Sequence, residues 1–383
     1  MKVPFFDYPG IYNRFKVDFD QIFNDVCSRG SFILQSDLEN FERELSSYLN
    51  VKHAIGVADG TNAIYLGLKA LDIGVGDEVI ISSHTYVATA NAIEMVGATP
   101  VFADIDNNNL LCPVASTSKI NSKTKAVIVV HMLGVPSRMK EISEICRQKN
   151  IFLIEDTAWG CGGRIEDKLL GTWGDIGTFS FDFAKTITTG EGGMLIFKDK
   201  EFYEKASAWH DHGHENNPKL PRWEDSRSSS GFNFRMTELQ GAVGIAQLKK
   251  LDLIIKKQRK NRDLIWEQVK LLRGIKKRGI PVGAYDTADA LIFFVKDGDT
   301  AKKCREELLK IKVSTKILPE AYTWHFAETW SHMPQLVESH NKDLTNAFPK
   351  SRDLLKKCVS IPIFFNMEKK LPQQIKGSLE SVL

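Results

Sequence analysis

Short apolar runs alternate with segments of helical period between about residue 50 and residue 200. Runs rich in Val, Ile and Phe predict six strands, namely EVIIS at 78–82, PVFAD at 100–104, AVIVV at 126–130, IFLIE at 151–155, GTFSF at 177–181 and MLIF at 194–197. Helical spacing predicts helices over 61–72, 87–97 and 137–150. Because strands that alternate with helices are typical of βαβ units, the sequence predicts a large α/β domain with a mostly parallel sheet.

The pattern changes in the second half of the chain. Residues 214–230 are polar, rich in Pro and Ser and without periodicity, which predicts a long exposed loop of the kind that often serves as a lid. From residue 236 a long helical pattern leads into a smaller region that ends in SIPIFFNMEKKLPQQIKGSLESVL. We expect a large domain over residues 1–250, including the N-terminal segment, and a small domain over residues 251–383.

The composition is that of an ordinary soluble globular protein. Of 383 residues, 51 are Lys or Arg and 48 are Asp or Glu, which leaves a formal charge of +3. The basic run KKQRKNR at 256–262 suggests nucleic acid at first sight. It lies, however, in a helical pattern whose apolar positions Leu248, Leu251 and Ile255 share one side. We interpret it as a solvated helix face, so neither a nucleic-acid nor a membrane partner is expected.

Cysteine usage and hydropathy indicate a cytoplasmic protein. Six cysteines are scattered without a C-x-x-C pair, so we expect reduced thiols, neither a disulfide framework nor a zinc knuckle. The start MKVPFFDYPGIYNRF has no apolar core that would serve as a signal peptide. The longest apolar stretch, near 126–135, is shorter than the roughly 18 residues that a membrane span needs.

The segment from 154 to 197 carries the most chemical information. Asp156 follows a predicted parallel strand, at the edge where open α/β sheets bind ligands. Lys185 lies among Phe, Ala, Thr and Ile residues, a setting in which an amine is kept partly desolvated and reactive. A strand-end carboxylate with a loop lysine is what pyridoxal 5'-phosphate chemistry needs, since the lysine forms a Schiff base and the carboxylate keeps the pyridine nitrogen protonated.

Other residues could complete such a site. Gly60, Thr61 and Asn62 begin a predicted helix, where free N–H groups favour a phosphate, and Ser180 could add a hydroxyl. Tyr86 precedes another helix and could stack on the pyridine ring. Each residue alone has an ordinary interpretation as a helix cap, a packing residue or a solvated side chain. Their order and joint presence favour the cofactor site.

Taken together, these blocks resemble the DegT-type (DegT/DnrJ/StrS) sugar aminotransferases from near residue 4 to the end of the chain. The matching pieces are GVADGTNAI, GDEVIISSHTYVATANAI, GATPVFADID, VVHMLG, IEDTAWGCGG, GDIGTFSFDFAKTITTGEGGM, GFNFRMTELQGAVGIAQLKKLD and SIPIFF. The resemblance implies a fold-type-I pyridoxal 5'-phosphate transferase, with a large domain whose mixed sheet is flanked by helices and a smaller α+β domain at the C-terminus.

The resemblance also assigns roles residue by residue. It implies Lys185 as the Schiff-base lysine, Asp156 as the partner of the ring nitrogen and Tyr86 as the stacking ring. Phosphate binding is implied for Gly60, Thr61, Ser180 and, from the other subunit of a homodimer, Asn233. His325 falls where members often hold a substrate-contacting histidine. Many members carry Gln or His where this chain has Trp159, whose indole N–H could still donate to the cofactor's ring oxygen.

The implied reaction moves an amino group from L-glutamate to a keto sugar in amino-sugar biosynthesis for surface polysaccharide such as lipopolysaccharide. The KTITTGEGGM stretch resembles enzymes for nucleotide-linked 4-keto-6-deoxyhexoses. DHGHENN and Trp324-His325 resemble enzymes that make 8-amino-3,8-dideoxy-octulosonate, a sugar acid without a nucleotide. A cluster of Lys219, Arg222 and Arg227 could receive either a pyrophosphate or a carboxylate. Glutamine stays open as an alternative donor.

Three alternative interpretations of the chain are less favoured. Three histidines occur at every second position, His210, His212 and His214, a spacing that is compatible with zinc ligands on one side of an extended segment. Because they border a polar loop, no metal site is expected. A Rossmann dehydrogenase is disfavoured because GCGG leads into a predicted hairpin, and GEGG precedes a strand. A cofactor-binding regulator or sensor is a distant alternative, since such a relative would be expected to lose Lys185 or to append a DNA-binding module.

Overall fold

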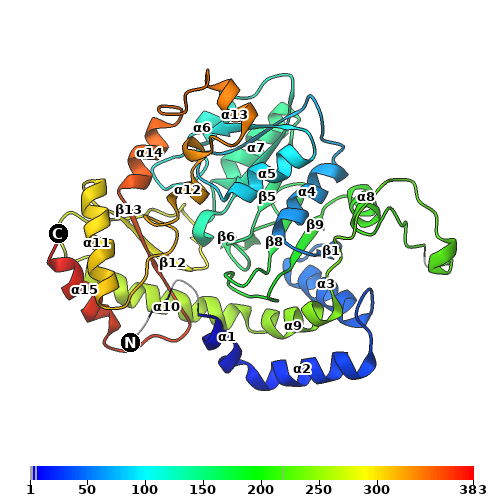
Figure 1. Cartoon of the computed structure of the whole chain (residues 1–383), viewed down its shortest axis with the longest axis horizontal. Coiled ribbons are helices and arrows are strands. Elements are labelled where there is room, and N and C mark those ends of the chain that lie inside the picture. Colours follow the sequence, from blue (N-terminus) through cyan, green and yellow to red (C-terminus); the bar gives the residue numbers. More distant parts are fainter. Residues whose placement is uncertain (1–2, 5–6, 218) are drawn as a thin grey trace.

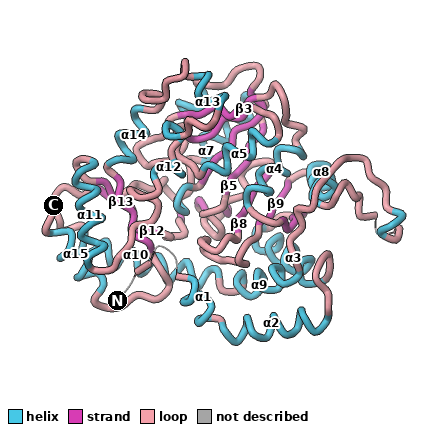
Figure 2. The backbone as a smooth tube through the Cα atoms, in the orientation of Figure 1, coloured by secondary structure: helices cyan, strands magenta, loops and turns pink. Residues whose placement is uncertain are grey.

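A seven-stranded sheet forms the centre of the protein. The structure is a computed structural model that describes residues 3–4, 7–217 and 219–383. Across the sheet the order is β1 (His53–Val57), β9 (Gly193–Phe197), β8 (Ile176–Ser180), β5 (Phe152–Asp156), β4 (Thr124–Val130), β2 (Glu78–Ser82) and β3 (Thr99–Ala103). All neighbours are parallel except β9, which runs antiparallel to both β1 and β8. The α/β fold with a mostly parallel mixed sheet is therefore confirmed (Figure 2).

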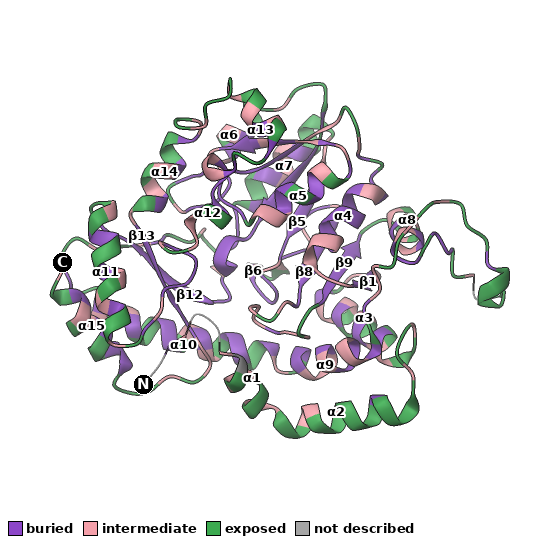
Figure 3. Cartoon of the chain, in the orientation of Figure 1, coloured by how far each residue is buried: buried purple, intermediate pink, exposed green. Residues whose placement is uncertain are grey.

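Helices cover both faces of this sheet because its strands alternate their apolar side chains. In β4, Ile128 joins the core that includes α4 and α5, whereas Val127 and Val129 join the core that includes α7. Figure 3 shows the strands buried between helices whose outer sides are exposed. The helices of this region are α3 (Ser36–Leu49), α4 (Gly60–Ala70), α5 (Val87–Met95), α6 (Pro113–Thr117), α7 (Met139–Lys149), α8 (Lys200–His210) and α9 (Glu238–Leu248).

The C-terminal part builds a second apolar core beside the large sheet. It consists of a three-stranded antiparallel sheet with helices packed on it, and Leu291, Phe293 and Ile361 lie in its core. Its elements are α10 (Leu251–Val269), β10 (Lys276–Lys277), β12 (Ala290–Phe294), α11 (Gly298–Lys310), β13 (Cys358–Pro362) and α15 (Leu371–Glu380). Between α11 and β13, the chain crosses back over the large sheet, where Trp330 and Phe348 pack against Phe102 of β3.

The remaining elements are short or peripheral. They are α1 (Tyr8–Arg14), α2 (Lys16–Arg29), α12 (Tyr322–His325), α13 (Pro334–Ser339), α14 (Pro349–Lys356), the strands β6 (Arg164–Ile165), β7 (Lys168–Leu169) and β11 (Ala284–Tyr285), and the 3-10 turns Met132–Gly134, Arg222–Glu224 and Ala327–Thr329. The strands β6 and β7 form the predicted hairpin after GCGG. Within the described residues no helix is both long and apolar enough to cross a membrane.

The pattern-based predictions agree with the large sheet and differ elsewhere in detail. All six predicted strands are present within one residue or two of their expected bounds, but the edge strand β1 was not predicted. The helical pattern from residue 236 is two helices, because the chain turns at Lys249 and Lys250 between α9 and α10. The loop after α8 extends away from the body of the protein (Figure 1). Pro218 of this loop lies outside the described residues.

Candidate active site

A cavity of about 570 Å³ opens where the parallel strands β5 and β8 end. This position is the ligand-binding edge of open α/β sheets, and the volume suits a cofactor with part of a substrate. Most of the residues singled out in the sequence line this one cavity, namely Gly60, Thr61, Asn62, Tyr86, Asp156, Trp159, Ser180, Lys185 and His325. The structure therefore brings together side chains that are as far apart in the sequence as residues 60 and 325.

One end of the cavity presents backbone donors from the start of α4. The carboxylate of Asp59 caps this helix and accepts hydrogen bonds from the backbone N and the Nδ2 of Asn62, at 2.9 and 2.7 Å. The N–H groups of Gly60 and Thr61 have no partner within the helix. Gly60 lies so close to Ser180 that a Cβ on it would be 2.8 Å from the Ser180 Cβ. This close approach places a hydroxyl beside two free N–H groups, which suits a phosphate.

Asp156 is a buried carboxylate at the end of β5. Its Oδ2 accepts a hydrogen bond of 2.9 Å from Thr89 Oγ1, and its Oδ1 accepts one of 3.1 Å from the backbone N of Ala158. Burial raises the pKa of Asp156, although these two hydrogen bonds and the positive charge of Lys185 oppose that shift. A carboxylate held in such a setting is suited to a cationic partner in the cavity.

Lys185 lies in the connection between β8 and β9, at the wall of the same cavity. Its Nζ is 3.8 Å from the centre of the Trp159 ring. In the described part of the chain, no hydrogen bond or ion pair engages this nitrogen. Burial lowers the pKa of Lys185, while Asp182, Asp156 and Asp289 oppose the shift. The amine therefore has the low proton affinity that a nucleophile or a base needs.

Two aromatic side chains and a histidine line the mouth of the cavity. Tyr86 precedes α5 and is 44% exposed, and its ring centre lies 5.3 Å from that of His325. His325 Nδ1 donates to the carbonyl oxygen of Ala321 at 2.9 Å, which leaves Nε2 as an acceptor. Burial lowers the pKa of His325 to about 4, so the ring is neutral near pH 7. Trp324 beside it is 62% exposed.

His84 contacts the backbone of His325 and holds it in place. His84 is buried, and its Nδ1 donates to the carbonyl oxygen of His325 at 3.0 Å. Burial lowers the pKa of His84 to about 3, so this ring also stays neutral. The hydrogen bond joins the end of β2 to α12, although the two residues are far apart in the sequence.

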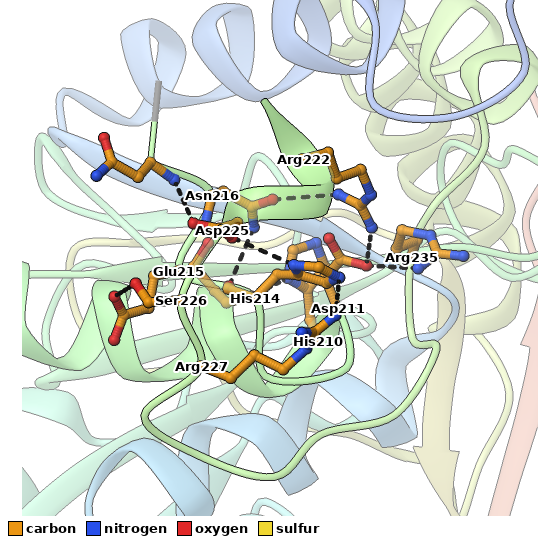
Figure 4. Close-up of polar contacts among 12 residues, drawn as sticks. His210, Asp211, His214, Glu215, Asn216, Arg222, Asp225, Ser226, Arg227 and Arg235 are labelled. Carbon is orange, nitrogen blue, oxygen red and sulfur yellow. Dashed lines mark hydrogen bonds and ion pairs between the residues drawn. The ribbon is translucent and has the colours of Figure 1, made fainter. Parts of the chain in front are cut away.

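Asn233 is the one predicted cofactor residue that does not line the cavity of its own chain. It is exposed, and its backbone pairs with that of Asp211 at the base of the loop that follows α8. Asp211 is fully buried and accepts hydrogen bonds from Arg222 Nη2, at 2.7 Å, and from Arg235 (Figure 4). Burial opposes ionisation here, but the two arginines lower the pKa of Asp211 to about 2.

The basic cluster predicted in this loop is engaged in holding the loop together. Figure 4 shows Arg227 pointing at His214, and its Nη2 lies 2.8 Å from His214 Nε2. His214 Nδ1 in turn lies 3.2 Å from the carboxylate of Asp225. Because Arg222 binds Asp211 and Arg227 binds His214, these two side chains are not free to receive a pyrophosphate or a carboxylate in this conformation. Only Lys219 of the predicted cluster lacks such a contact among the described residues.

The three histidines near this loop do not converge. His210 Nδ1 donates to the carbonyl oxygen of Ser207 at 2.5 Å, while His214 is engaged with Asp225 and Arg227. Over residues 3–4, 7–217 and 219–383, no group of three or more His, Cys, Asp or Glu side chains is placed to hold a metal ion. The six cysteines are free thiols in this structure.

Asp59, Thr89 and Lys316 are among the residues of the site that were missed in the sequence. Asp59 and Thr89 carried a usable signal, because an Asp before a helix start is a typical N-cap and Thr89 lies one helical turn after Tyr86. Lys316 carried none. Its Nζ lies 4.9 Å from the centre of the Trp159 ring, and only the tertiary fold brings it there.

Comparisons with known proteins agree with this geometry. The sequence matches the DegT/DnrJ/EryC1/StrS aminotransferase family over residues 14–380. It is 34% identical over 340 residues to GDP-perosamine synthase of Escherichia coli O157:H7, which covers 88% of this chain and 86% of the relative. GDP-perosamine synthase of Vibrio cholerae is 41% identical over 235 residues, or 61% of each chain.

A solved structure extends the likeness to three dimensions. NtdA of Bacillus subtilis with bound cofactor PMP superposes with a TM-score of 0.87 at 25% identity, over 100% of this chain and 85% of that chain. The resemblance seen in the sequence is thereby confirmed in the fold. The chain belongs to the DegT/DnrJ/EryC1/StrS aminotransferase family.

Proposed function

We propose that this protein transfers an amino group from L-glutamate to a nucleotide-linked keto sugar, with pyridoxal 5'-phosphate bound in the 570 Å³ cavity. One observation carries the proposal. A buried strand-end carboxylate, a desolvated lysine and a helix start with free backbone N–H groups surround a single cavity, as Asp156, Lys185 and Gly60 do here.

The residues of the cavity fit the cofactor on which aminotransferases of this family depend. Gly60, Thr61 and Ser180 would supply donors for its phosphate, and Lys185 would supply the amine that holds its aldehyde carbon. The buried carboxylate of Asp156 suits a protonated pyridine nitrogen. When bound, the cofactor acts as an electron sink that stabilises negative charge on the α-carbon of an amino acid.

The chain's own residues supply the binding and the proton transfers. Asp156 holds the proton on the ring nitrogen, because a cation beside it relieves the cost of its burial. Thr89 orients that carboxylate through its 2.9 Å hydrogen bond. Tyr86, which lines the same cavity, would stack on the ring. Lys185, whose pKa is lowered by burial, would serve as the base that takes a proton from the α-carbon of the amino substrate.

We propose a homodimer in which Asn233 of one subunit completes the phosphate site of the other. Two observations support this arrangement. Asn233 is exposed and does not line the cavity of its own chain. Its backbone pairs with that of Asp211 at the base of the loop that follows α8, where Arg222 and Arg235 form ion pairs with the Asp211 carboxylate. From the free thiols and the proposed activity, we place the enzyme in the cytoplasm.

The nature of the keto sugar is proposed from the relatives. Two of them are named GDP-perosamine synthase, which favours a nucleotide-linked substrate and a role in the synthesis of surface polysaccharide such as lipopolysaccharide. His325 would accept a hydrogen bond from a sugar hydroxyl through Nε2. The second candidate is a keto sugar acid without a nucleotide, which Trp324 and His325 suggested in the sequence. Retention of Lys185 in a desolvated setting favours an enzyme over a regulator.

The decisive experiment tests the covalent link and then the acceptor. Borohydride reduction of the holoenzyme should leave a pyridoxyl group on the peptide that contains Lys185. It should leave none in Lys185→Ala, whereas Lys200→Ala, which removes a surface lysine of α8, should label normally. The glutamate-treated enzyme is then offered nucleotide-linked 4-keto-6-deoxyhexoses and keto sugar acids in turn. Absence of label at Lys185, or no amination of any keto sugar, would contradict the proposal.

A further inference from the structure

A second buried lysine lies behind the proposed cofactor lysine. Lys316 is 3% exposed and forms an ion pair with Asp289, which is 5% exposed. Its Nζ is 4.9 Å from the centre of the Trp159 ring, and Lys185 Nζ is 3.8 Å from the same centre. The two Nζ atoms are therefore no farther apart than the sum of those two distances. This separation is about one Debye length at physiological salt, so a charge on one lysine acts on the other.

The same three charged groups meet at a second, smaller cavity. This cavity, of about 50 Å³, has room for one or two water molecules and is lined by Lys185, Asp289 and Lys316. Lys185 thus lies at the wall between the large cavity and a small compartment that contains an ion pair. Of the two lysines, only Lys316 has an ionic partner among the residues that the structure describes.

Main-chain hydrogen bonds hold the ion pair in place. The backbone N of Lys316 donates to the carbonyl oxygen of Ser360 in β13 at 2.7 Å. Asp289 immediately precedes β12, and its carbonyl oxygen accepts a hydrogen bond of 3.1 Å from the backbone N of Ile363. Because both backbones are tied to the same small sheet, the pair is a fixed feature of the C-terminal part of the chain.

We propose that Lys316 is a positioning residue that occupies Asp289 and so leaves the amine of Lys185 free for the cofactor. This inference rests on the proposed function, in which Lys185 holds the cofactor. A buried carboxylate is stable only with a partner. Without Lys316, the cations that line the small cavity with Asp289 are Lys185 and Arg14, and Asp289 acts electrostatically on Lys185. Lys185 would then turn away from the large cavity and stay protonated as the partner of Asp289.

Electrostatics supports the competition that this inference requires. Asp289 raises the proton affinity of Lys185, and Lys316 lowers it, in both cases through space. The other charged or titratable groups that line the two cavities are Asp59, Tyr86, Asp156, Asp182, Glu191 and His325 at the large one and Asp7 and Arg14 at the small one. None of these groups is ion-paired to Asp289 in the described part of the chain. Asp289 acts electrostatically on Lys185, whereas the carboxylate that acts on Arg14 is Asp7, so loss of Lys316 would leave the negative charge of Asp289 to Lys185.

Competitive acetylation of the cofactor-free protein tests the inference without any turnover. The enzyme is labelled with trace acetic anhydride between pH 6 and pH 11, and the midpoint of labelling at Lys185 is read by mass spectrometry of its peptide. In Lys316→Met we expect this midpoint to rise by about one pH unit or more, as expected for an unneutralised buried carboxylate nearby. Lys310→Met removes a surface lysine paired with Glu307 and should leave the midpoint unchanged.

A double variant separates this role from a merely structural one. Lys316→Met combined with Asp289→Asn should return the midpoint to within about 0.3 units of the wild type, although it removes both members of the pair. Asp289→Asn alone should lower the midpoint, because Lys316 is then an unpaired neighbouring cation. If Lys316→Met fails to fold, Asp289→Asn still decides, since an unchanged or raised midpoint overturns the inference.

The remaining outcomes are equally clear. An unshifted midpoint in folded Lys316→Met, or a double variant that is no closer to the wild type, overturns the inference. Because these measurements use the apo protein, they can succeed even if borohydride fails to mark Lys185 in the holoenzyme. That pair of results would refute the cofactor role while leaving the charge competition established.

Discussion

Gly60→Ala gives a sharp test of the phosphate end of the cavity. A Cβ at this position would lie 2.8 Å from Ser180 Cβ and 3.1 Å from Ser180 Oγ, so the start of α4 and the end of β8 must separate. Separation would weaken at least one charge-assisted hydrogen bond to the phosphate, worth about 1.5–3 kcal/mol. Since about 1.4 kcal/mol is tenfold in affinity, the Kd for cofactor should rise roughly 10- to 150-fold.

The assay is a titration of the apo protein with pyridoxal 5'-phosphate, followed by its absorbance. Gly67→Ala is the matched control, because it lies in the same helix and its Cβ would meet its nearest neighbour, Ile176 Cγ2, at an ordinary 3.4 Å. That control should bind cofactor normally. It should also unfold at a slightly higher temperature, because replacing a helical Gly by Ala stabilises the folded state by up to about 1 kcal/mol. A wild-type Kd in folded Gly60→Ala would refute the assignment of the phosphate to this end of the cavity.

Three further outcomes follow from the site and the loop. Asp156→Asn should bind cofactor yet lose most of its rate, about 100-fold or more, because the ring nitrogen no longer keeps its proton; a near-normal kcat would remove Asp156 from the mechanism. Thr89→Val deletes one hydrogen bond to that carboxylate and should weaken cofactor binding about three- to tenfold by the same titration, with no change expected for the distant Thr117→Val. Asp211 has a folded pKa of about 2, below its ordinary value near 3.8, so its stabilising effect is complete above pH 3.8 and is lost as the pH falls towards 2. Asp211→Asn should therefore loosen the loop even at pH 5, seen as faster proteolysis within residues 214–230, and equal cleavage of wild type and variant would contradict the role of this carboxylate.

The sequence predicted the parts of the fold that depend on local patterns. The strands β2 and β5 are short, with an apolar run of three residues in each, so their approximate bounds and the position of Asp156 at a strand end could be inferred directly. The edge strand β1 was missed because its run HAIGV contains Gly and Ala and lacks the β-branched density of its neighbours. Its place in the sheet depends on pairing with the distant β9.

The candidate site was predicted as far as single residues carry their own signal. Local motifs indicated the chemistry of three residues that line one cavity, namely Lys185, Asp156 and Gly60. The residues that contact the site and change its electrostatics lie far away in the sequence. Lys316 reaches Trp159 only through the packing of the C-terminal part, and Arg222 is drawn to Asp211 by a buried charge that no local pattern reveals. A basic cluster in a sequence does not show whether its side chains are already engaged in ion pairs or hydrogen bonds within the folded protein.

The antiparallel direction of β9 has a consequence for the order in which the protein acquires its parts. Lys185 stands in a connection whose two ends are joined directly, since the backbone N of Phe181 donates to the carbonyl oxygen of Gly192 at 2.8 Å. Closing this hairpin brings together residues that are near in sequence, so it costs little chain entropy and favours early formation. On the ribosome, the residues of this hairpin are synthesised before Asp289 and Lys316, so the segment that carries the amine precedes the ion pair that lies behind it.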